Sequence, residues 1–81
     1  MEELVREIVE PMVSNKEALM IKTIPETADE PAQVIVITNK DDTARLIGKG
    51  GAVANAIRKV VSIKSRLDGK KIRVKFESYD E

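Results

Sequence analysis

Three glycines lie within four residues, at Gly48, Gly50 and Gly51, between two apolar stretches that favour helices. Because glycine adopts positive φ angles with little strain, this cluster predicts a tight turn between two helices instead of one long helix. Glycines also let backbone N–H groups approach a phosphate where a Cβ would clash. The second helix adds free N–H groups and the positive end of its dipole, and Lys49 adds a charge. The segment therefore has the features of a phosphate-binding turn.

Apolar spacing predicts the elements that precede this turn. Apolar residues recur with helical spacing over residues 2–13, and Pro11 predicts that this helix kinks or ends early. Residues 18–24 are predicted to form a strand, and residues 25–32, which include two prolines, a loop. The β-branched run at residues 33–38 is typical of a strand that is covered on both faces or lies at the centre of a sheet.

The second half of the chain predicts two helices and a strand. Asp42 or Thr43 is expected to cap a short helix that runs to about Ile47. A longer helix is expected over residues 52–65, and a turn at residues 68–69 follows it. The apolar residues Ile72, Val74 and Phe76 alternate with charged residues, and this alternation predicts the final strand.

The order of elements predicts an α+β fold in one domain, residues 1–81. The order is helix, strand, strand, helix, helix, strand, that is α-β-β-α-α-β. The two strands that flank the helical pair need a crossover connection, so they are expected to run parallel, with a right-handed crossover. We therefore expect a three-stranded mixed sheet with three helices packed on one face.

Composition excludes several classes of function. The 81 residues contain no cysteine and no histidine, so thiolate metal sites, the usual zinc ligands and the usual general base are missing. We expect no enzyme activity, no metal site and no cofactor. No stretch approaches the ~20 apolar residues of a membrane span. The N-terminal segment Met1-Glu2-Glu3 is acidic where a signal peptide would be basic, which predicts a cytoplasmic protein.

A net charge of zero hides a strong asymmetry along the chain. Residues 1–42 carry four basic and ten acidic side chains, whereas residues 43–81 carry ten basic and four acidic ones. The glycine turn lies in the basic half, which indicates a polyanionic partner. The alternative is that these charges only solvate the surface. The basic face of the final strand (Lys71, Arg73 and Lys75) is open to either interpretation.

Two other glycine motifs do not fit. A P-loop needs Ser or Thr after its lysine, but Gly50 follows Lys49. A dinucleotide fingerprint that began at Gly48 would need a glycine where the chain has Val53. Both motifs also require a strand directly before the turn, where this sequence predicts a helix. Mononucleotide and dinucleotide binding are therefore disfavoured.

The segment from Leu46 to Gly51, followed by Ala-Asn-Ala-Ile-Arg at residues 54–58, resembles the core of the K-homology (KH) domain. In that domain a Gly-x-x-Gly loop joins two helices and clamps about four nucleotides of single-stranded RNA or DNA. The element order resembles the type II version, with an N-terminal helix and strand at about 2–24 and a KH core at about 33–77. The short chain resembles the small stand-alone bacterial KH proteins, the KhpA (YlqC) group.

The resemblance implies roles for the residues that match the motif. Gly48 and Gly51 would be the two framework glycines that bring the backbone against the phosphates. Lys49 and Gly50 would be the variable pair between them, and Lys49 would make the charged contact. Many family members carry a polar or basic residue after the second glycine, whereas this chain has Ala52-Val53, which predicts modest affinity. Ile47 would line an apolar groove for bases, and two arginines are expected at its edges. The expected RNA-binding residues are Ile47, Gly48, Lys49, Gly50, Gly51, Ala52, Arg45 and Arg58.

On this interpretation the chain binds single-stranded RNA with low sequence specificity, as an RNA chaperone or post-transcriptional regulator. One alternative is a protein-interaction module that acts mainly through a partner KH protein. Another is a double-stranded DNA binder, which is disfavoured because Ala52, Val53 and Ala54 put no polar side chain at the start of the helix. For the turn alone, the simplest alternative is a tight corner between helices.

Apolar residues of the helix after the turn cover an arc of roughly 200°, twice the ~100° that a surface helix needs to cover its own sheet. The surplus lies around Val60, Val61 and Ile63. We therefore expect a homodimer, or a heterodimer with a larger KH-containing RNA-binding protein, and the resemblance implies the same. The alternative is that the N-terminal helix covers this flank.

Overall fold

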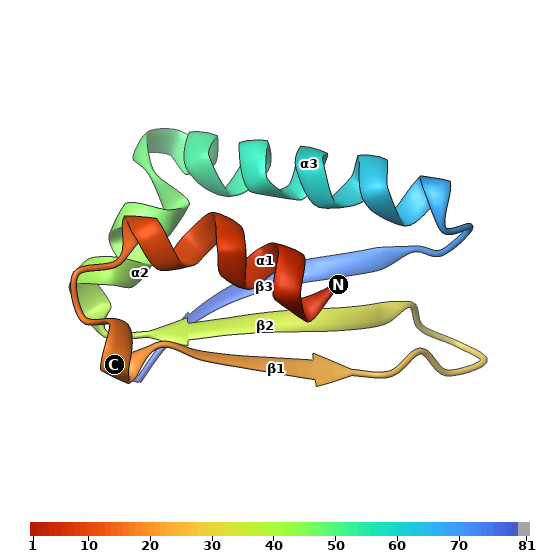
Figure 1. The fold of residues 1–81 in the computed structure, drawn as a ribbon, viewed down its shortest axis with the longest axis horizontal. Coiled ribbons are helices and arrows are strands. Elements are labelled where there is room, and N and C mark those ends of the chain that lie inside the picture. Colours follow the sequence, from red (N-terminus) through yellow and green to blue (C-terminus); the bar gives the residue numbers. More distant parts are fainter. Residues whose placement is uncertain (80–81) are drawn as a thin grey trace.

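The computed structural model describes residues 1–79 as a three-stranded sheet with three α-helices on one of its faces (Figure 1). The strands are β1 (Met20–Ile24), β2 (Ala32–Thr38) and β3 (Ile72–Ser78), in that spatial order. Strand β2 pairs antiparallel with β1 and parallel with β3. The predicted α+β class, element order and mixed sheet are confirmed.

The β-branched run forms the central strand, as predicted. Val34, Val36 and Thr38 of β2 are buried, whereas the alternating residues are only partly covered. Val34 lies opposite Val74 of β3. Alternate burial places one face of β2 against the helices and leaves the other face open.

The N-terminal helix ends before Pro11. Helix α1 (Glu2–Val9) is followed by a 3₁₀ turn, η1 (Glu10–Met12). Proline lacks the N–H that an α-helix would need here, so the early end agrees with the sequence prediction. The next strand was expected from residue 18, but a second 3₁₀ turn, η2 (Lys16–Ala18), occupies that position. Strand β1 therefore begins two residues later than predicted.

The cap predicted for the short helix is wrong. Helix α2 (Lys40–Ile47) begins three residues before Thr43, and its N-cap is Asn39. The Asn39 Oδ1 atom accepts a hydrogen bond of 2.9 Å from the Asp42 N–H. Asn, Asp and Thr all favour caps, so residue type alone does not distinguish the three neighbours.

The core fills the space between the helices and the sheet. Its members are aliphatic, and the most deeply buried come from all three helices and the central strand: Val5, Val9, Leu46, Val61, Val34 and Val36. Helix α3 (Ala52–Leu67) runs two residues further than expected and contacts α1, α2 and β3. Within residues 1–79, no helix is long and apolar enough to span a membrane.

Candidate nucleic-acid interface

The glycine turn, residues 48–51, reverses the chain between α2 and α3 at one end of the molecule (Figure 1). Gly48, Gly50 and Gly51 all have positive φ, at 74°, 63° and 79°. Residues Lys49–Gly51 form a 3₁₀ turn, η3, and the Gly51 N–H donates to the Gly48 carbonyl at 3.1 Å. Each glycine therefore occupies a conformation that other residues rarely adopt.

The three glycines differ in how much space surrounds them. A Cβ on Gly48 would lie 2.5 Å from Cγ2 and 3.0 Å from the backbone nitrogen of Val53. No described atom outside the neighbouring residues lies within 4 Å of a Cβ on Gly50. Gly48 therefore lets the turn pack against the first turn of α3, whereas Gly50 lies at the open side of the loop.

Helix α3 starts directly at the glycine turn without a side-chain cap. Its N-cap is Gly51, and no described side chain accepts a hydrogen bond from its first amides. The first turn carries no acidic residue to neutralise the positive end of the helix dipole. Exposed Lys49 adds a cation beside these amides, so the turn and the helix start together attract an anion.

Helix α2 is fastened to the sheet by Thr43. The Thr43 hydroxyl donates to the Asn39 carbonyl at 2.9 Å and lies 2.6 Å from the Thr38 hydroxyl. It also lies 3.1 Å from the Glu77 carbonyl on β3. This buried contact ties the helix before the glycine turn to the ends of two strands, which fixes the turn relative to β3.

Asp42 anchors the opposite side of the same helix. Its carboxylate is fully buried and accepts hydrogen bonds from the Ser14 N–H, the Ser14 hydroxyl and the Asn15 N–H at 2.9–3.0 Å. These donors, chiefly the backbone amides of Ser14 and Asn15, favour the ionised carboxylate. Their effect outweighs the loss of hydration on burial, which favours the protonated form. The pKa of Asp42 is therefore lowered from its ordinary value.

Arg45 and Arg58 lie in different surroundings. The Arg45 guanidinium pairs with Asp42 at 2.8 Å, and 56% of its side chain stays exposed, one helical turn before the glycine turn. Arg58 donates from Nε to the Val74 carbonyl at 3.1 Å. Its guanidinium lies over the Phe76 ring, 5.5 Å from the centroid. Arg58 therefore lies against β3 and not on a fully solvated side of α3.

A shallow trough runs between α3 and the outer edge of β3. This trough is a hollow of about 420 Å³ lined by Arg58, Ser62 and residues 72–75. Sequence reasoning included Arg58 and left Arg73 and Lys75 open, but it missed Ser62, Ile72 and Val74, because their approach depends on how α3 crosses the sheet. The alternation of the final strand identifies its faces, but it does not identify the helix residues that lie opposite its edge.

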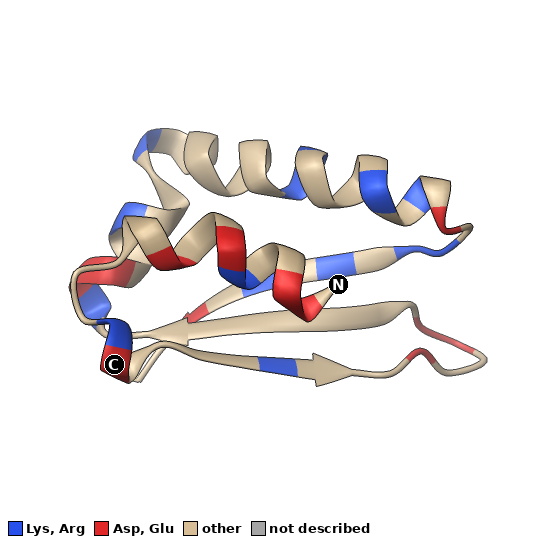
Figure 2. Cartoon of the chain, viewed as in Figure 1, with Lys and Arg blue, Asp and Glu red and all other residues tan. Residues whose placement is uncertain are grey.

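The remaining predicted residues lie at or beside the glycine turn. Ile47 ends α2 with 38% of its surface exposed, and Ala52 begins α3 with its side chain exposed. Figure 2 shows acidic residues along α1 and in the loop between β1 and β2, while basic residues concentrate on α3 and β3. The charge asymmetry of the sequence is thus a spatial asymmetry.

Comparison with known proteins assigns the family. The family model described as KhpA/KhpB, KH domain matches residues 2–76. A protein of Listeria monocytogenes named RNA-binding protein KhpA is 39% identical over 74 residues, which cover 91% of this chain and 95% of that protein. A Bacillus subtilis protein of the same name is 35% identical over 80 residues, covering 99% of this chain and 94% of its own. The chain therefore belongs to the KhpA/KhpB KH-domain family.

Proposed function

We propose that this protein binds single-stranded RNA through the glycine turn and the adjoining trough. The observation that carries the proposal is the uncapped start of α3 at three positive-φ glycines. Among the backbone amides of residues 48–52, those of Gly48, Gly51 and Ala52 donate within the chain. The amides of Lys49 and Gly50 would therefore donate to phosphate oxygens, and the Lys49 side chain would add a charge-assisted contact. The curated relatives named RNA-binding protein KhpA support RNA as the ligand.

Bases would lie beside the turn and over the trough. Ile47 offers exposed apolar surface at the end of α2, and Val74 and Ile72 belong to the strand that bounds the trough. Arg58, held by Val74 and Phe76, presents a fixed guanidinium plane at its edge. Single-stranded bases can stack on such a plane without being read by hydrogen bonds, so low sequence specificity follows.

The start of α3 argues against recognition of double-stranded DNA. A recognition helix inserts polar side chains from its N-terminal end into the major groove. Here the first three residues are Ala52, Val53 and Ala54, of which Ala54 is buried. We therefore favour a role as a cytoplasmic RNA chaperone or post-transcriptional regulator.

The same proposal includes pairing with another KH domain through α3. Val60, Ile63 and Leu67 are 48%, 63% and 79% exposed, and they lie three or four residues apart. Val61, which the sequence placed in this surplus, lies in the core instead, with 1% exposed. Helix α1 leaves Val60 and Ile63 open, so the stripe Val60–Ile63–Leu67 offers an apolar face to a second chain. Pairing would also join two weak RNA sites and raise avidity.

The alternative function is that the protein acts only through a partner KH protein. Photocrosslinking distinguishes this function from direct RNA binding. The purified protein is crosslinked to a short photoreactive single-stranded RNA, and the modified peptides are mapped. We expect the crosslinks within residues 45–58 and on β3, and competition by single-stranded RNA but not by duplex DNA. Crosslinks confined to α1 and β1, or no crosslinking by the purified protein, would contradict direct RNA binding.

A further inference from the structure

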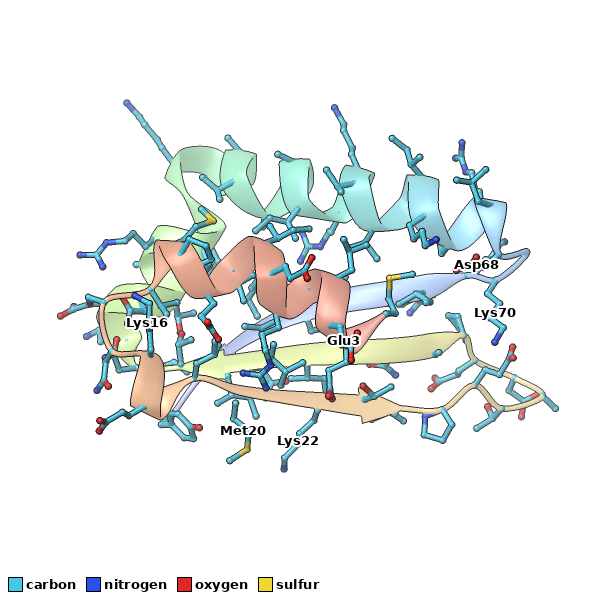
Figure 3. The ribbon with its side chains drawn as sticks, viewed as in Figure 1. Glu3, Lys16, Met20, Lys22, Asp68 and Lys70 are labelled. Atoms are coloured by element: carbon cyan, nitrogen blue, oxygen red, sulfur yellow. The ribbon has the colours of Figure 1, made fainter. Side chains whose placement is uncertain are left out.

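A second basic site lies at the far end of the trough. Where α3 ends and β3 begins, a hollow of about 400 Å³ is lined by four cationic side chains, two serines and the start of both long strands. The cations are Arg66, Lys70, Lys71 and Arg73, all exposed. Lys70 is at the opposite end of the molecule from the glycine turn (Figure 3).

None of these four cations forms an ion pair in the part of the chain that the structure describes, residues 1–79. The ion pairs formed there join Arg6 to Glu10, Arg45 to Asp42 and Lys64 to Asp68. Acidic residues of the β1–β2 loop lie nearby, but they line a neighbouring hollow with Lys70 and Lys71, not the one that holds Arg66 and Arg73. Arg66 and Arg73 therefore offer the freest donors for an anion.

The basic hollow adjoins the trough described above. Ser62, Ile72 and Arg73 line both hollows, so the hollow beside Arg58 and the hollow beside Arg66 are neighbours. Along α3, the fourteen steps from Ala52 to Arg66 correspond to about 21 Å at the ~1.5 Å rise of an α-helix. The glycine turn and the second basic site therefore lie at opposite ends of α3.

We propose that Arg66, Lys70, Lys71 and Arg73 form a second phosphate site that holds RNA nucleotides beyond those clamped at the glycine turn. A KH clamp accommodates about four nucleotides, and a longer strand that follows the trough along β3 meets these cations next. Arginine suits this role because its planar fork donates two parallel hydrogen bonds to a phosphate. The proposal rests on the proposed RNA binding and predicts that affinity increases with RNA length.

Two RNA lengths test this inference. Fluorescence anisotropy compares a four-nucleotide RNA of mixed sequence, the length that a KH clamp accommodates, with one roughly three times as long, which extends beyond the clamp. The variant Arg66→Gln/Arg73→Gln removes two cations without introducing repulsion from the acidic loop. Arg6→Gln/Lys22→Gln is the matched control, because neither residue lines the trough or the basic hollow. Strand β1 also lies at the edge of the sheet opposite β3, and Lys22 points away from the helices (Figure 3).

We expect the wild type to bind the longer RNA about tenfold more tightly, with a salt dependence steeper by about 1.4 for two extra phosphate contacts at ~0.7 each. The Arg66→Gln/Arg73→Gln variant should lose this gain and keep the affinity for the short RNA, whereas the control should keep both. Equal affinity for both lengths, or an unchanged gain in the variant, would overturn the second site alone. Absence of binding to either RNA would overturn the proposed function, and the second site with it.

A purely structural role for Arg66 gives a different result. Cations in the last turn of a helix stabilise it through the dipole, so the substitution would lower the melting temperature. Such a role would change the affinity for both RNA lengths together or for neither. Melting curves of the variant and the control therefore accompany the titrations, and a length-independent effect contradicts the proposal.

Discussion

Gly48 packs directly against Val53, so that the end of α2 and the first turn of α3 touch across the glycine turn. A Cβ at Gly48 would lie 2.5 Å from the Val53 Cγ2 atom and 3.0 Å from the Val53 backbone nitrogen. The backbone of Gly48 also has φ 74° and ψ 172°, a region that is open essentially to glycine alone. This contact explains why the first glycine of the turn serves the fold as well as the candidate site.

Substitution of individual glycines should separate these two roles. Gly48→Ala is expected to lower the free energy of unfolding by about 2–4 kcal/mol, because strain adds to overlap with Val53. Gly50→Ala should cost only about 1–2 kcal/mol, since its φ of 63° is strained but its surroundings are open. Urea denaturation of both variants measures the difference. Similar losses of stability would show that the packing against Val53 is not tight.

Asp42 should make stability fall in acid. Its pKa is lowered in the folded protein, so its stabilising contribution is complete above the unfolded value of about 3.9 and is lost as pH falls through the lower, folded value. Asp42→Asn should therefore be less stable at neutral pH and lose less stability below about pH 4. Asp41→Asn, at the exposed neighbour, is the control. Parallel pH profiles for wild type and Asp42→Asn would refute this role.

Arg58 should contribute to RNA affinity and to stability through the planar shape of its guanidinium as well as through its charge. Arg58→Lys keeps the charge but loses the Nε donor to Val74 and the planar contact with Phe76. We expect RNA affinity to weaken about two- to fivefold and stability to fall by about 1 kcal/mol. Arg6→Lys, on α1, is the matched control. RNA affinity equal to wild type in Arg58→Lys would exclude Arg58 from the interface.

The apolar stripe of α3 should control self-association. Val60→Asp and Ile63→Asp place a carboxylate at the centre of the proposed contact, so each should convert a dimer into a monomer. Ile24→Asp, at an apolar residue of β1 with a similar exposed fraction of 42%, should remain a dimer. Light scattering at micromolar concentration measures the mass. A monomeric wild type, or variants that keep the dimer mass, would contradict pairing through this stripe.

Much of the fold follows from periodicity in the sequence. The continuous β-branched run predicted β2 and the period-two alternation predicted β3. The crossover through two helices predicted that these strands run parallel, as they do. The local ends were less predictable: Asn39, Asp42 and Thr43 are all good caps, and only the hydrogen bond to the Asp42 amide distinguishes them. Likewise, Ala18, where the sequence predicted the start of a strand, belongs to the 3₁₀ turn Lys16–Ala18.

The candidate site was predictable where its residues are contiguous in the chain. The segment from Ile47 to Ala52 forms one turn, so its composition alone located it. Arg58 was also a candidate on sequence grounds, but its contacts with Val74 and Phe76 depend on the crossing of α3 over β3. Val61 was predicted to be among the exposed apolar residues of α3. The width of the apolar arc on this helix does not show which side of the arc packs against the sheet.

The central claim is that the glycine turn binds RNA, and the double variant Lys49→Asp/Gly50→Asp tests it most directly. Both positions are exposed, and Gly50 has space for a side chain, so the fold should survive at a cost of about 1–2 kcal/mol. Lys22→Asp/Gly69→Asp is the matched control, because Gly69 also has positive φ and open surroundings.

The measurement is the affinity for a four-nucleotide single-stranded RNA, with circular dichroism to verify that each variant is folded. Two carboxylates facing the phosphates should abolish binding by Lys49→Asp/Gly50→Asp, whereas the control should bind as the wild type does. The wild-type affinity should decline with salt at a slope set by about 2–3 phosphates at ~0.7 each. A folded Lys49→Asp/Gly50→Asp protein with unchanged RNA affinity would contradict the assignment of the site.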